Sequence, residues 1–437
     1  MSGLSTWAWD YDGWIVLAGI LCAISASLPG NFLLLRRMSL LGDAISHAIL
    51  PGLAVAFFIS ESRSSVPMFA GAVVVGILTA LFTEWIRNFG DVDEGASMGV
   101  VFTTLFALGL VMIVQAADHV DLDPGCVLYG AIEMTPLDTV SVRGTDVPRV
   151  VIVLGAVTLV NAILIVVFFK ELKLSAFDPS LSVSVGVSAR LMHYLLMVIV
   201  AITAVACFET AGNILVVAMF VVPPATACLL TERLSRMILL STLIAAASAV
   251  LGHISAITVP GWFGFGSTST SGMMALCAGL LFFLASLFAP RGVLVQAVRR
   301  QKLAMRILSE DLIALLYRLD EKQRGCTATM SQLCTPLLSG RRLISFLMSR
   351  HRHHGDVIAV ESGYQLTESG RRLGAELVRS HRLWEQYLVS EAGVAMDRIH
   401  DQAEHLEHFT GRDMRDRLEQ ETAAPVTDPH GSPIPPE

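Results

Sequence analysis

The sequence has little charge for its length. Only 16% of its 437 residues are Asp, Glu, Lys or Arg, whereas 53% are hydrophobic and the mean hydropathy is +0.61. Soluble globular domains carry about 25% charged residues. The composition therefore excludes an ordinary soluble protein and indicates a polytopic membrane protein.

Several sequence motifs are also missing. The chain has no GxxxxGK[ST] stretch, which excludes an intrinsic P-loop ATPase, and no HExxH stretch, which weighs against a metallohydrolase. The seven cysteines include no CxxC pair and lie mostly in apolar runs, so we expect no disulfide framework. No basic segment precedes the first apolar run, so we expect that run to be a retained span and not a signal peptide.

Long apolar runs, by contrast, dominate the first two thirds of the chain. Each is near the roughly twenty residues that a helix needs to cross a bilayer. We expect spans at residues 13–35, 38–60, 66–86, 96–116, 149–169, 190–208, 212–231, 237–257 and 271–289. Nine crossings form an all-α polytopic membrane domain whose termini lie on opposite sides.

Basic residues collect in alternate loops between these runs. The positive-inside rule assigns such loops to the cytoplasm. They carry Arg36, Arg37, Arg87, Lys170, Lys173, Arg190, Arg233, Arg236 and Arg291. The long loop at 116–149, on the other side, is rich in Asp. We therefore expect the N-terminus outside and the C-terminal part in the cytoplasm.

The composition changes near residue 290, in the stretch PRGVLVQAVRRQKLAMRILSEDL, where the apolar runs end and the share of charged residues rises. We expect a transmembrane domain at 1–290, a linker at 291–308 and a cytoplasmic domain at 309–437.

One ionisable pair lies inside an apolar run. The stretch SLLGDAISHAILPG, residues 39–52, places Asp43 and His47 four residues apart, so both lie on one face of a helix. A carboxylate at membrane depth is costly unless it is paired or bound to a metal. The alternative is a position near the cytoplasmic end, where Arg36, Arg37 or lipid headgroups would satisfy both side chains.

The neighbouring residues favour a functional site. A carboxylate and an imidazole suit first-row divalent metals. Two ligands are too few for a cage, so a second subunit or water would complete the shell. Pro51 and Gly52 allow a kink next to the pair. Small residues would let another helix or a second subunit approach closely; they are Gly42, Ala44, Ser46 and Ala48.

The stretch RRMSLLGDAISHAILPGLAVAF resembles the signature of the integral-membrane permeases of the manganese, zinc and iron ABC importer family. Four further stretches extend the likeness over about residues 10–290: DEGASMGVVFTTLFALGLV, DLDPGCVLYGAIE, LKLSAFDPSLSVSVGV and GNILVVAMFVVPPATACLL. The resemblance implies a multi-pass permease in the bacterial inner membrane, working as a homodimer or as a heterodimer with a related permease.

The resemblance also implies roles for single residues. Asp43 and His47 would contribute the metal site on the translocation path. Phe177, Asp178 and Pro179 lie where such permeases offer a coupling helix to the ATPase; the alternative for them is a helix-capping Asp-Pro turn. The implied partners are a separate ABC ATPase subunit and an extracytoplasmic metal-binding protein.

Other polar residues of the membrane domain give weaker indications. We interpret His193 and His253 as hydrogen-bonded structural histidines near span ends. Glu209 and Asn213, around the turn CFETAGN, could line an entrance or simply mark the turn. The acidic segment 118–123, with Asp118, His119, Asp121 and Asp123, would form an outer mouth that attracts cations; the alternative is an ordinary solvated loop.

The cytoplasmic part carries a second set of potential metal ligands. In SHRLWEQYL and DRIHDQAEHLEHF, His and Glu recur at helical spacing, so two helices could each present ligands along one face. The alternative is an exposed, charged amphipathic surface. The residues concerned are His381, Glu385, His400, Glu404, Glu407 and His408.

From SEDLIALLYRLDEKQ to VTDPHGSPIP the pattern is similar to that of the iron-dependent and manganese-dependent repressor family. The resemblance implies a winged-helix-like part at 309–372 and helices for metal binding and dimerisation at 373–437. It implies a primary site of Asp311, Glu404, Glu407 and His408 and a second site of His381, Glu385 and His400. In a manganese-type arrangement His381 would join the primary site. Iron-type repressors have cysteine at the position of Glu404, so this residue favours Mn²⁺.

The cytoplasmic part departs from that family in two places. Ala314 stands where a manganese-type repressor has a further carboxylate ligand. The missing ligand counts against a site that holds two metal ions. The presumed recognition helix, SGRRLISFLMSR, lacks a base-reading face, although the wing-like DVIAVESGYQLTESG is kept. The basic patch around this helix could meet phosphate, anionic lipid or acidic protein; it comprises Arg341, Arg342, Arg350, Arg352, His351, His353 and His354.

Together these features predict the permease subunit of an ATP-driven importer of divalent transition-metal ions, with Mn²⁺ preferred and Zn²⁺ or Fe²⁺ as alternatives. The cytoplasmic tail would sense metal and regulate transport. The alternative is a membrane-anchored, metal-dependent transcription regulator, although tethering to a membrane makes DNA an awkward partner. An intramembrane metallohydrolase at Asp43 and His47 is disfavoured, because a third ligand and a general base are missing.

Overall fold

The computed structural model describes residues 7–60, 65–117, 132–142, 144–266, 268–423 and 425–436. The acidic segment 118–123, expected to form an outer mouth, lies outside the described residues. The chain forms two compact units, Met1–Gln296 and Ala297–Glu437.

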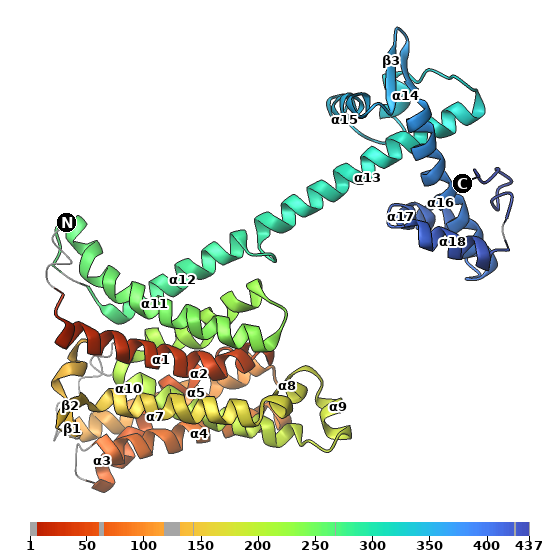
Figure 1. Ribbon diagram of the computed structural model, residues 1–437. Helices are drawn as coiled ribbons and strands as arrows, with labels where there is room; N and C mark the ends of the chain where they lie inside the picture. Colours follow the sequence, from red (N-terminus) through yellow and green to blue (C-terminus); the bar gives the residue numbers. More distant parts are fainter. Residues whose placement is uncertain are drawn as a thin grey trace. The chain divides into compact units, whose positions relative to one another are not determined.

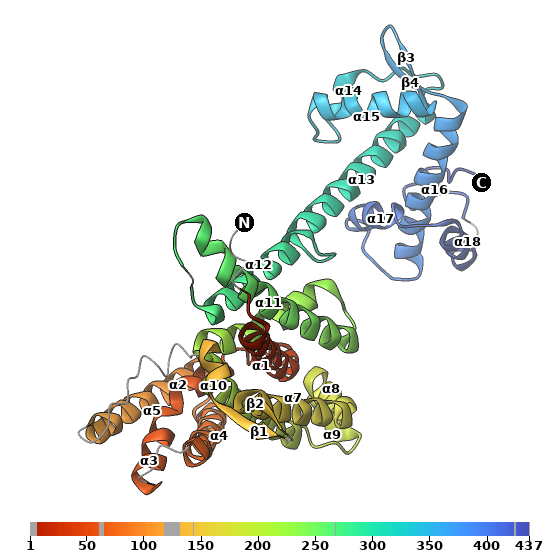
Figure 2. The same ribbon diagram turned by 60° about the vertical axis from the view of Figure 1, so that its left-hand side comes forward.

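The first unit is built mainly from helices (Figure 1). Its elements are α1 (Trp9–Leu35), α2 (Leu41–Ala48), α3 (Leu50–Ser60), α4 (Ser65–Gly90), α5 (Glu94–Ala117), the 3₁₀ helix η2 (Ile132–Leu137), β1 (Thr139–Val142), β2 (Thr145–Pro148), α7 (Arg149–Val167), α8 (Phe169–Phe177), α9 (Pro179–Ser184), α10 (Ala189–Leu230), α11 (Leu234–Trp262) and α12 (Thr270–Phe288). The strands β1 and β2 form an antiparallel hairpin just before α7 (Figure 2).

Among the described residues, eight helices are long and apolar enough to cross a membrane, so the chain is a multi-pass membrane protein. The sequence predicted nine crossings. The difference arises at α10, whose 42 residues take in two of the expected spans. At 1.5 Å per residue this helix would be about 63 Å long, roughly twice the hydrocarbon thickness of a bilayer.

The chain reverses direction within α10, at Gly212. This residue has φ 75° and ψ 168°, a conformation that glycine adopts without steric cost. Before it, His193 contacts Arg36 just beyond the end of α1, and Cys207 contacts Ser25 farther back along α1. After it, Phe220 packs against Gly30, so the chain has turned back. The two arms of α10 therefore correspond to the two expected spans.

The second span is broken in the middle. The segment Leu41–Ser60 is long enough for one crossing, but α2 ends at Ala48 and α3 begins at Leu50. Pro51 has no backbone N–H and cannot bond to the carbonyl of His47 four residues earlier, which accounts for the break. The kink expected next to the ionisable pair is thus present.

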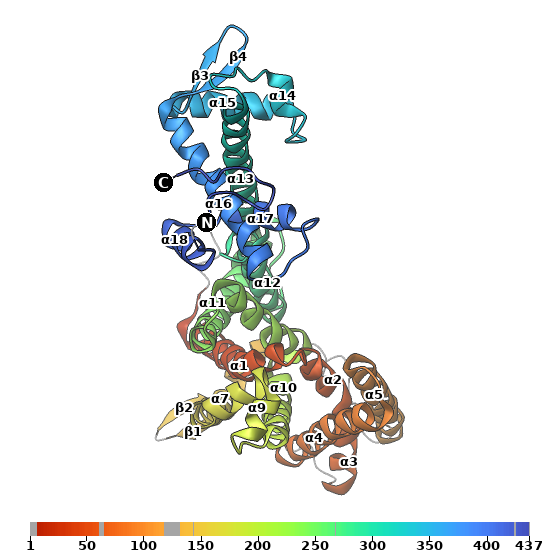
Figure 3. The same ribbon diagram turned by 90° about the vertical axis from the view of Figure 1, so that its right-hand side faces the viewer.

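Helices of this unit approach one another at glycines. A Cβ atom added at Gly30 would lie 2.2 Å from the backbone oxygen of Phe220, and one added at Gly52 would lie 2.4 Å from that of Gly71. The second contact joins α3 to α4, and both pack against α5 on one side of the unit (Figure 3). Small residues permit such approaches between membrane helices.

The second unit has the elements α13 (Val293–Lys322), α14 (Met330–Cys334), α15 (Arg341–His354), β3 (Val357–Val360), β4 (Gly363–Leu366), α16 (Glu368–Ser390), α17 (Ile399–Glu407) and α18 (Arg412–Glu421). The strands β3 and β4 pair as an antiparallel hairpin beside α14 and α15 (Figures 2 and 3). Leu312, Leu333, Ile344 and Val357 belong to one buried core, which joins α13, α14, α15 and the hairpin as a winged helix. The expected helical membrane domain, followed by an α-rich tail with a winged helix, is confirmed; the membrane unit adds only the short hairpin of β1 and β2.

The residues expected to form a linker, 291–308, are largely helical, because α13 begins at Val293. The division between the two compact units falls inside this helix, between Gln296 and Ala297.

Candidate metal sites

The first candidate site lies at the break between α2 and α3. The Oδ1 atom of Asp43 lies 3.4 Å from Nε2 of His47, one helical turn later. The Nδ2 atom of Asn213, at the tip of the α10 hairpin, lies 3.4 Å from the same carboxylate oxygen and 3.2 Å from the same imidazole nitrogen. Ser46 donates a hydrogen bond of 2.6 Å to Oδ1 of Asn213 and so fixes the amide.

Apolar side chains surround this group of three residues. The His47 ring lies 6.0 Å from the ring of Phe102 and 5.9 Å from that of Phe106, both on α5. The Asp43 and His47 side chains are 38% and 29% exposed on the surface of the single chain. The site is therefore open on one side and walled by aromatic rings on another.

The basic residue Arg36, considered as a partner for the pair, points elsewhere. Its guanidinium donates to Oγ of Ser175 at 2.7 Å and contacts Nδ1 of His193 at 3.1 Å. Among the described residues, the polar side-chain contacts of Asp43 and His47 are with each other and with Asn213.

Asn213 joins the site, whereas the sequence left open whether it lines an entrance or marks a turn. Its neighbour Gly212 reverses the chain, and the first residue after that reversal faces α2. A polar residue directly after a glycine within a long apolar stretch was the available signal. Glu209, considered together with Asn213, lies instead in a separate cavity of about 380 Å³ with Asp138 and Arg149.

The two histidines interpreted as structural are both hydrogen-bonded to carboxylates. His253 lies 3.0 Å from Oδ1 of Asp12, and His193 lies 3.1 Å from Oε2 of Glu84.

The stretch Phe177–Pro179 forms the junction of α8 and α9, with Asp178 as the one residue between the two helices. Oδ1 of Asp178 accepts hydrogen bonds from the backbone N–H of Leu181 at 2.9 Å and from Oγ of Ser180 at 2.6 Å, which caps α9. Phe177 is 60% exposed. Asp178 thus forms the helix cap that the alternative interpretation expected. The Phe177 ring is at the same time exposed and available to a partner.

The second candidate site is a triangle of His381, Glu385 and His400 on α16 and α17. Nε2 of His381 lies 3.1 Å from Oε1 of Glu385 and 3.0 Å from Nδ1 of His400, and the last two atoms are also 3.0 Å apart. His381 and Glu385 are buried, whereas His400 is 56% exposed. His430, from the C-terminal segment, comes within 3.9 Å of Glu385.

The third candidate site combines Asp311 of α13 with Glu407 and His408 at the end of α17. Nε2 of His408 lies 3.0 Å from Oδ1 of Asp311 and 3.7 Å from Oε1 of Glu407. This nitrogen is buried, and it has no hydrogen-bond partner among the described residues despite the nearby oxygen atoms. A buried nitrogen that faces two carboxylates without a well-formed hydrogen bond fits a metal ligand.

One carboxylate connects the two sites of the tail. Oε2 of Glu407 lies 2.6 Å from Nδ1 of His381, while its other oxygen faces His408. The sequence left open whether His381 belongs to the primary or to the second site; it contacts residues of both. Glu310, which the sequence did not single out, contacts Nδ1 of His408 at 2.8 Å. Its position directly before Asp311 was the signal.

Glu404 is not brought to either site. The buried face of α17 consists of Ile399, Ala403 and Glu407, four residues apart, so Glu404 is turned toward solvent and is exposed. Neither group of potential ligands within the described residues contains it. The argument for Mn²⁺ that the sequence drew from the oxygen of Glu404 is therefore not supported by the structure. Ala314 is buried and supplies no ligand.

The charges around these sites shift the protonation of the ligands. Burial disfavours the charged form of His408, but the Asp311 and Glu310 carboxylates outweigh burial and raise its pKa to about 9. Burial also disfavours the charged form of His381, but its contacts with the Glu385 and Glu407 carboxylates outweigh burial, so the pKa of His381 is raised. The pKa of Glu385 is lowered to about 2, because its contacts with His381 and His400 outweigh burial. Without a metal, the protonated imidazoles of His381 and His408 therefore form ion pairs with these carboxylates.

The two parts of the chain match two family models. Residues 10–289 match the ABC 3 transport family, and residues 367–436 match the iron dependent repressor, metal binding and dimerisation domain. The chain belongs to the ABC 3 transport family and carries a C-terminal domain of the repressor type. It is a permease subunit and not itself an enzyme, because ATP hydrolysis in ABC transporters of this family resides in a separate subunit.

Three known proteins illustrate the similarity. The manganese transport system membrane protein MntD of Bacillus subtilis (strain 168) is 40% identical over 292 residues, which cover 66% of this chain and 96% of the relative. The zinc transport system membrane protein TroD of Treponema pallidum (strain Nichols) is 39% identical, with 68% and 78% covered. The structure of PsaBC from Streptococcus pneumoniae in complex with Fab matches with a TM-score of 0.54 and 29% identity, over 66% of this chain and 95% of that chain.

Proposed function

We propose that this chain is the permease subunit of an ATP-driven importer of divalent transition-metal ions, with Mn²⁺ preferred and Zn²⁺ or Fe²⁺ as alternatives. The observation that carries the proposal is the convergence of Asp43, His47 and Asn213 inside the membrane unit. A carboxylate, an imidazole and an amide offer hard and borderline donors, which suit these ions. The relatives named as manganese and zinc transport proteins support the same cargo.

The proposed transport site is shared by two subunits. Asp43 and His47 are exposed by a third on the single chain, and three donors are fewer than the four to six that these ions usually take. A second permease subunit, identical or related, would supply the remaining donors. Incomplete coordination within one subunit also suits a transporter, which must release its ion.

The proposed orientation follows from the distribution of charge. Arg36, Arg37, Arg87 and Arg190 gather at one end of the membrane unit, which the positive-inside rule assigns to the cytoplasm. The N-terminus would then lie outside, where an extracytoplasmic metal-binding protein delivers the ion. The ATPase subunit would dock on the cytoplasmic side at Phe177–Pro179, where an exposed aromatic ring projects beside a capped short helix.

The proposed role of the tail is to sense metal and regulate transport. Asp311, Glu407 and His408 would hold one ion, and His381, Glu385 and His400 a second. Glu407 contacts residues of both groups, so filling one site alters the other. Metal bound by the tail changes transport only if the tail binds metal with different affinity in different states of the permease.

Transport by purified protein tests this proposal. The chain is reconstituted in proteoliposomes with its ATPase subunit, and the extracytoplasmic metal-binding protein is added on the outer side. Uptake of ⁵⁴Mn²⁺ is measured with ATP or with a non-hydrolysable analogue. The proposal predicts uptake with ATP but not with the analogue. It also predicts that metal added on the side of the membrane that carries the tail inhibits uptake. A Glu407→Gln and His408→Ala variant should transport without that inhibition. Equal inhibition in the variant would reject the regulatory role while leaving the transport role in place.

The second candidate function is that of a membrane-anchored transcription regulator. One observation favours it: the hairpin of β3 and β4 is formed, and α15 keeps Arg341, Arg342 and Arg350 exposed. Binding of the full-length chain in detergent to DNA fragments of the host genome, with and without Mn²⁺, discriminates the two functions. Metal-dependent, sequence-specific retention would establish the regulator, and its absence would leave transport as the function.

A further inference from the structure

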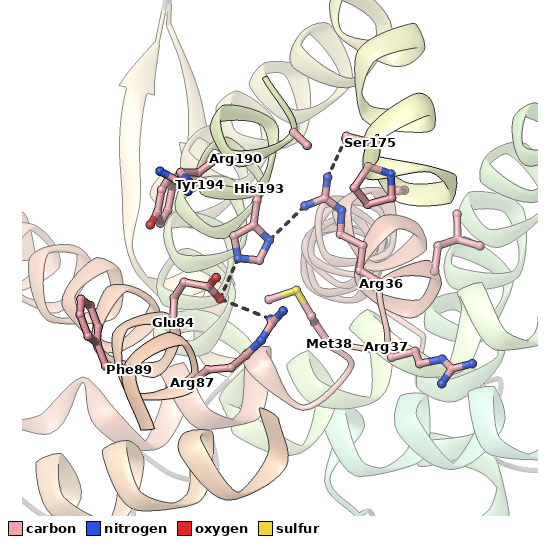
Figure 4. A pocket seen from close by; sticks show the side chains of 14 residues that line it. Arg36, Arg37, Met38, Glu84, Arg87, Phe89, Ser175, Arg190, His193 and Tyr194 are labelled. Atoms are coloured by element: carbon pink, nitrogen blue, oxygen red, sulfur yellow. Dashed lines mark hydrogen bonds and ion pairs between the residues drawn. The ribbon is translucent and has the colours of Figure 1, made fainter. Parts of the chain in front are cut away.

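A large pocket opens where α1 ends and α10 begins (Figure 4). Its volume is about 830 Å³. Four arginines line it, namely Arg36, Arg37, Arg87 and Arg190, and Glu84 is the one carboxylate among the lining residues that the structure describes. An excess of positive charge in a concave site favours an anionic ligand.

The inner wall of the pocket is a chain of hydrogen bonds (Figure 4). Arg36 donates to Oγ of Ser175 and contacts Nδ1 of His193. Because a guanidinium only donates, Nδ1 of His193 accepts, and its Nε2–H donates to Oε2 of Glu84 at 3.1 Å. Arg87 also contacts this carboxylate, at 3.4 Å. The one acidic group in the pocket is thus already engaged and does not cancel the charge of the rim.

The rim of the pocket carries the two other arginines. Arg37 and Arg190 are both exposed. Within the described part of the chain, neither forms an ion pair with a carboxylate. A guanidinium group is suited to bind the oxygen atoms of a phosphate, so each of these two arginines adds to the attraction of the pocket for such an anion.

An apolar groove of about 420 Å³ adjoins the pocket. It is lined by Leu81, Phe82, Trp85 and Phe89 of α4 and by Tyr194 of α10. Phe89 and Tyr194 line the pocket and the groove alike, so the two are direct neighbours. Trp85 and Phe89 are 58% and 80% exposed. Exposed aromatic rings at the end of a membrane-spanning helix are typical of the membrane–water interface.

We propose that the arginine pocket and the aromatic groove together bind one anionic phospholipid. The phosphate lies in the arginine-lined pocket, and an acyl chain lies along Trp85. Free phosphate would use the pocket but would leave the groove without a role, whereas a phospholipid has a charged head for the one and a hydrocarbon tail for the other. Basic pockets between membrane helices are known to accept anionic headgroups. The site also borders Ser175 and Pro179, so the lipid lies beside the segment between α8 and α9.

Quenching of Trp85 fluorescence tests the proposal. The full-length chain in neutral detergent micelles is titrated with phosphatidylglycerol carrying brominated acyl chains, and in parallel with brominated phosphatidylcholine. The contribution of Trp85 is the difference between the wild type and a Trp85→Phe variant. The test variant is Arg37→Gln with Arg190→Gln, which changes only exposed residues. The matched control is Lys170→Gln with Lys173→Gln, two exposed cations of α8 that do not line the pocket.

The proposal predicts that phosphatidylglycerol quenches Trp85 at roughly tenfold lower concentration than phosphatidylcholine in the wild type and in the lysine control. In the arginine variant the two lipids should quench alike. Addition of inorganic phosphate at millimolar concentration should leave quenching unchanged. Equal quenching by both lipids in the wild type would overturn the proposal, and so would displacement by inorganic phosphate, which would assign the pocket to a free anion. Selectivity that persists in the arginine variant would equally overturn it.

Discussion

Replacement of Glu407 by glutamine should weaken metal binding at both sites of the tail, because this carboxylate faces His381 with one oxygen and His408 with the other. The exchange keeps the shape of the side chain and removes one negative charge. Glu404→Gln is the matched control, since it makes the same change three residues earlier on the same helix, at an exposed position outside both groups of ligands.

The size of the effect follows from the charge that is lost. A unit charge about 4 Å from a divalent ion contributes about 2 kcal/mol even at the dielectric constant of bulk water. This is a lower limit, because the Glu407 side chain is only 3% exposed and a lower dielectric constant strengthens the attraction. At about 1.4 kcal/mol for each factor of ten, affinity should fall at least roughly thirtyfold.

The assay is a titration of the full-length chain with Mn²⁺, in which free ion is followed by electron paramagnetic resonance. The Asp43→Ala substitution is present throughout, so that only the tail binds metal. We expect weak binding in Glu407→Gln and unchanged binding in Glu404→Gln. The opposite result, with loss in Glu404→Gln and none in Glu407→Gln, would refute the geometry of the tail and favour the ligand set implied by the resemblance to repressors.

Three further predictions follow from the same contacts. Asn213→Asp places a second carboxylate beside Asp43, so both KM and maximal rate of Mn²⁺ uptake should fall, because the ion binds more tightly and leaves more slowly; a raised KM would contradict the placement of Asn213. Because the pKa of His408 is raised to about 9, a metal must displace its proton at neutral pH. The metal affinity of the tail should therefore fall about tenfold for each pH unit below the pKa of His408. A metal affinity that is constant between pH 6.5 and 8.5 would exclude His408 as a ligand. Gly52→Ala drives a methyl group into the backbone of α4 and should cost about 1–3 kcal/mol of stability, whereas Gly155→Ala, which meets nothing within 4 Å, should not lower the melting temperature; equal melting temperatures would show that α3 and α4 do not pack as described.

The sequence predicted the membrane unit well, because hydropathy reports directly on helices that must satisfy their own backbone groups in lipid. It also predicted that Asp43 and His47 share a helical face, since a spacing of four residues fixes that relation. It did not place Asn213 beside them. That contact depends on the reversal of the chain at Gly212 and on the packing of α10 against α2, both of which are long-range features.

The tail shows the same limit. Helical spacing grouped Glu404 with Glu407 and His408, but spacing does not say which stripe of α17 is buried. Packing against α16 turns Ala403 and Glu407 inward and leaves Glu404 in solvent. The partnership of Glu407 with His381 likewise joins residues on different helices, which local periodicity does not report.

Uptake of metal by cells that express the Asp43→Ala and His47→Ala variants tests the central claim most directly. Rates of Mn²⁺, Zn²⁺ and Fe²⁺ uptake are compared with the wild type at equal amounts of protein in the membrane. Loss of uptake of the physiological ion in both variants, with the variants still assembled with their ATPase subunit, is the predicted result. Wild-type uptake of all three ions in both variants would contradict a transport site at Asp43 and His47.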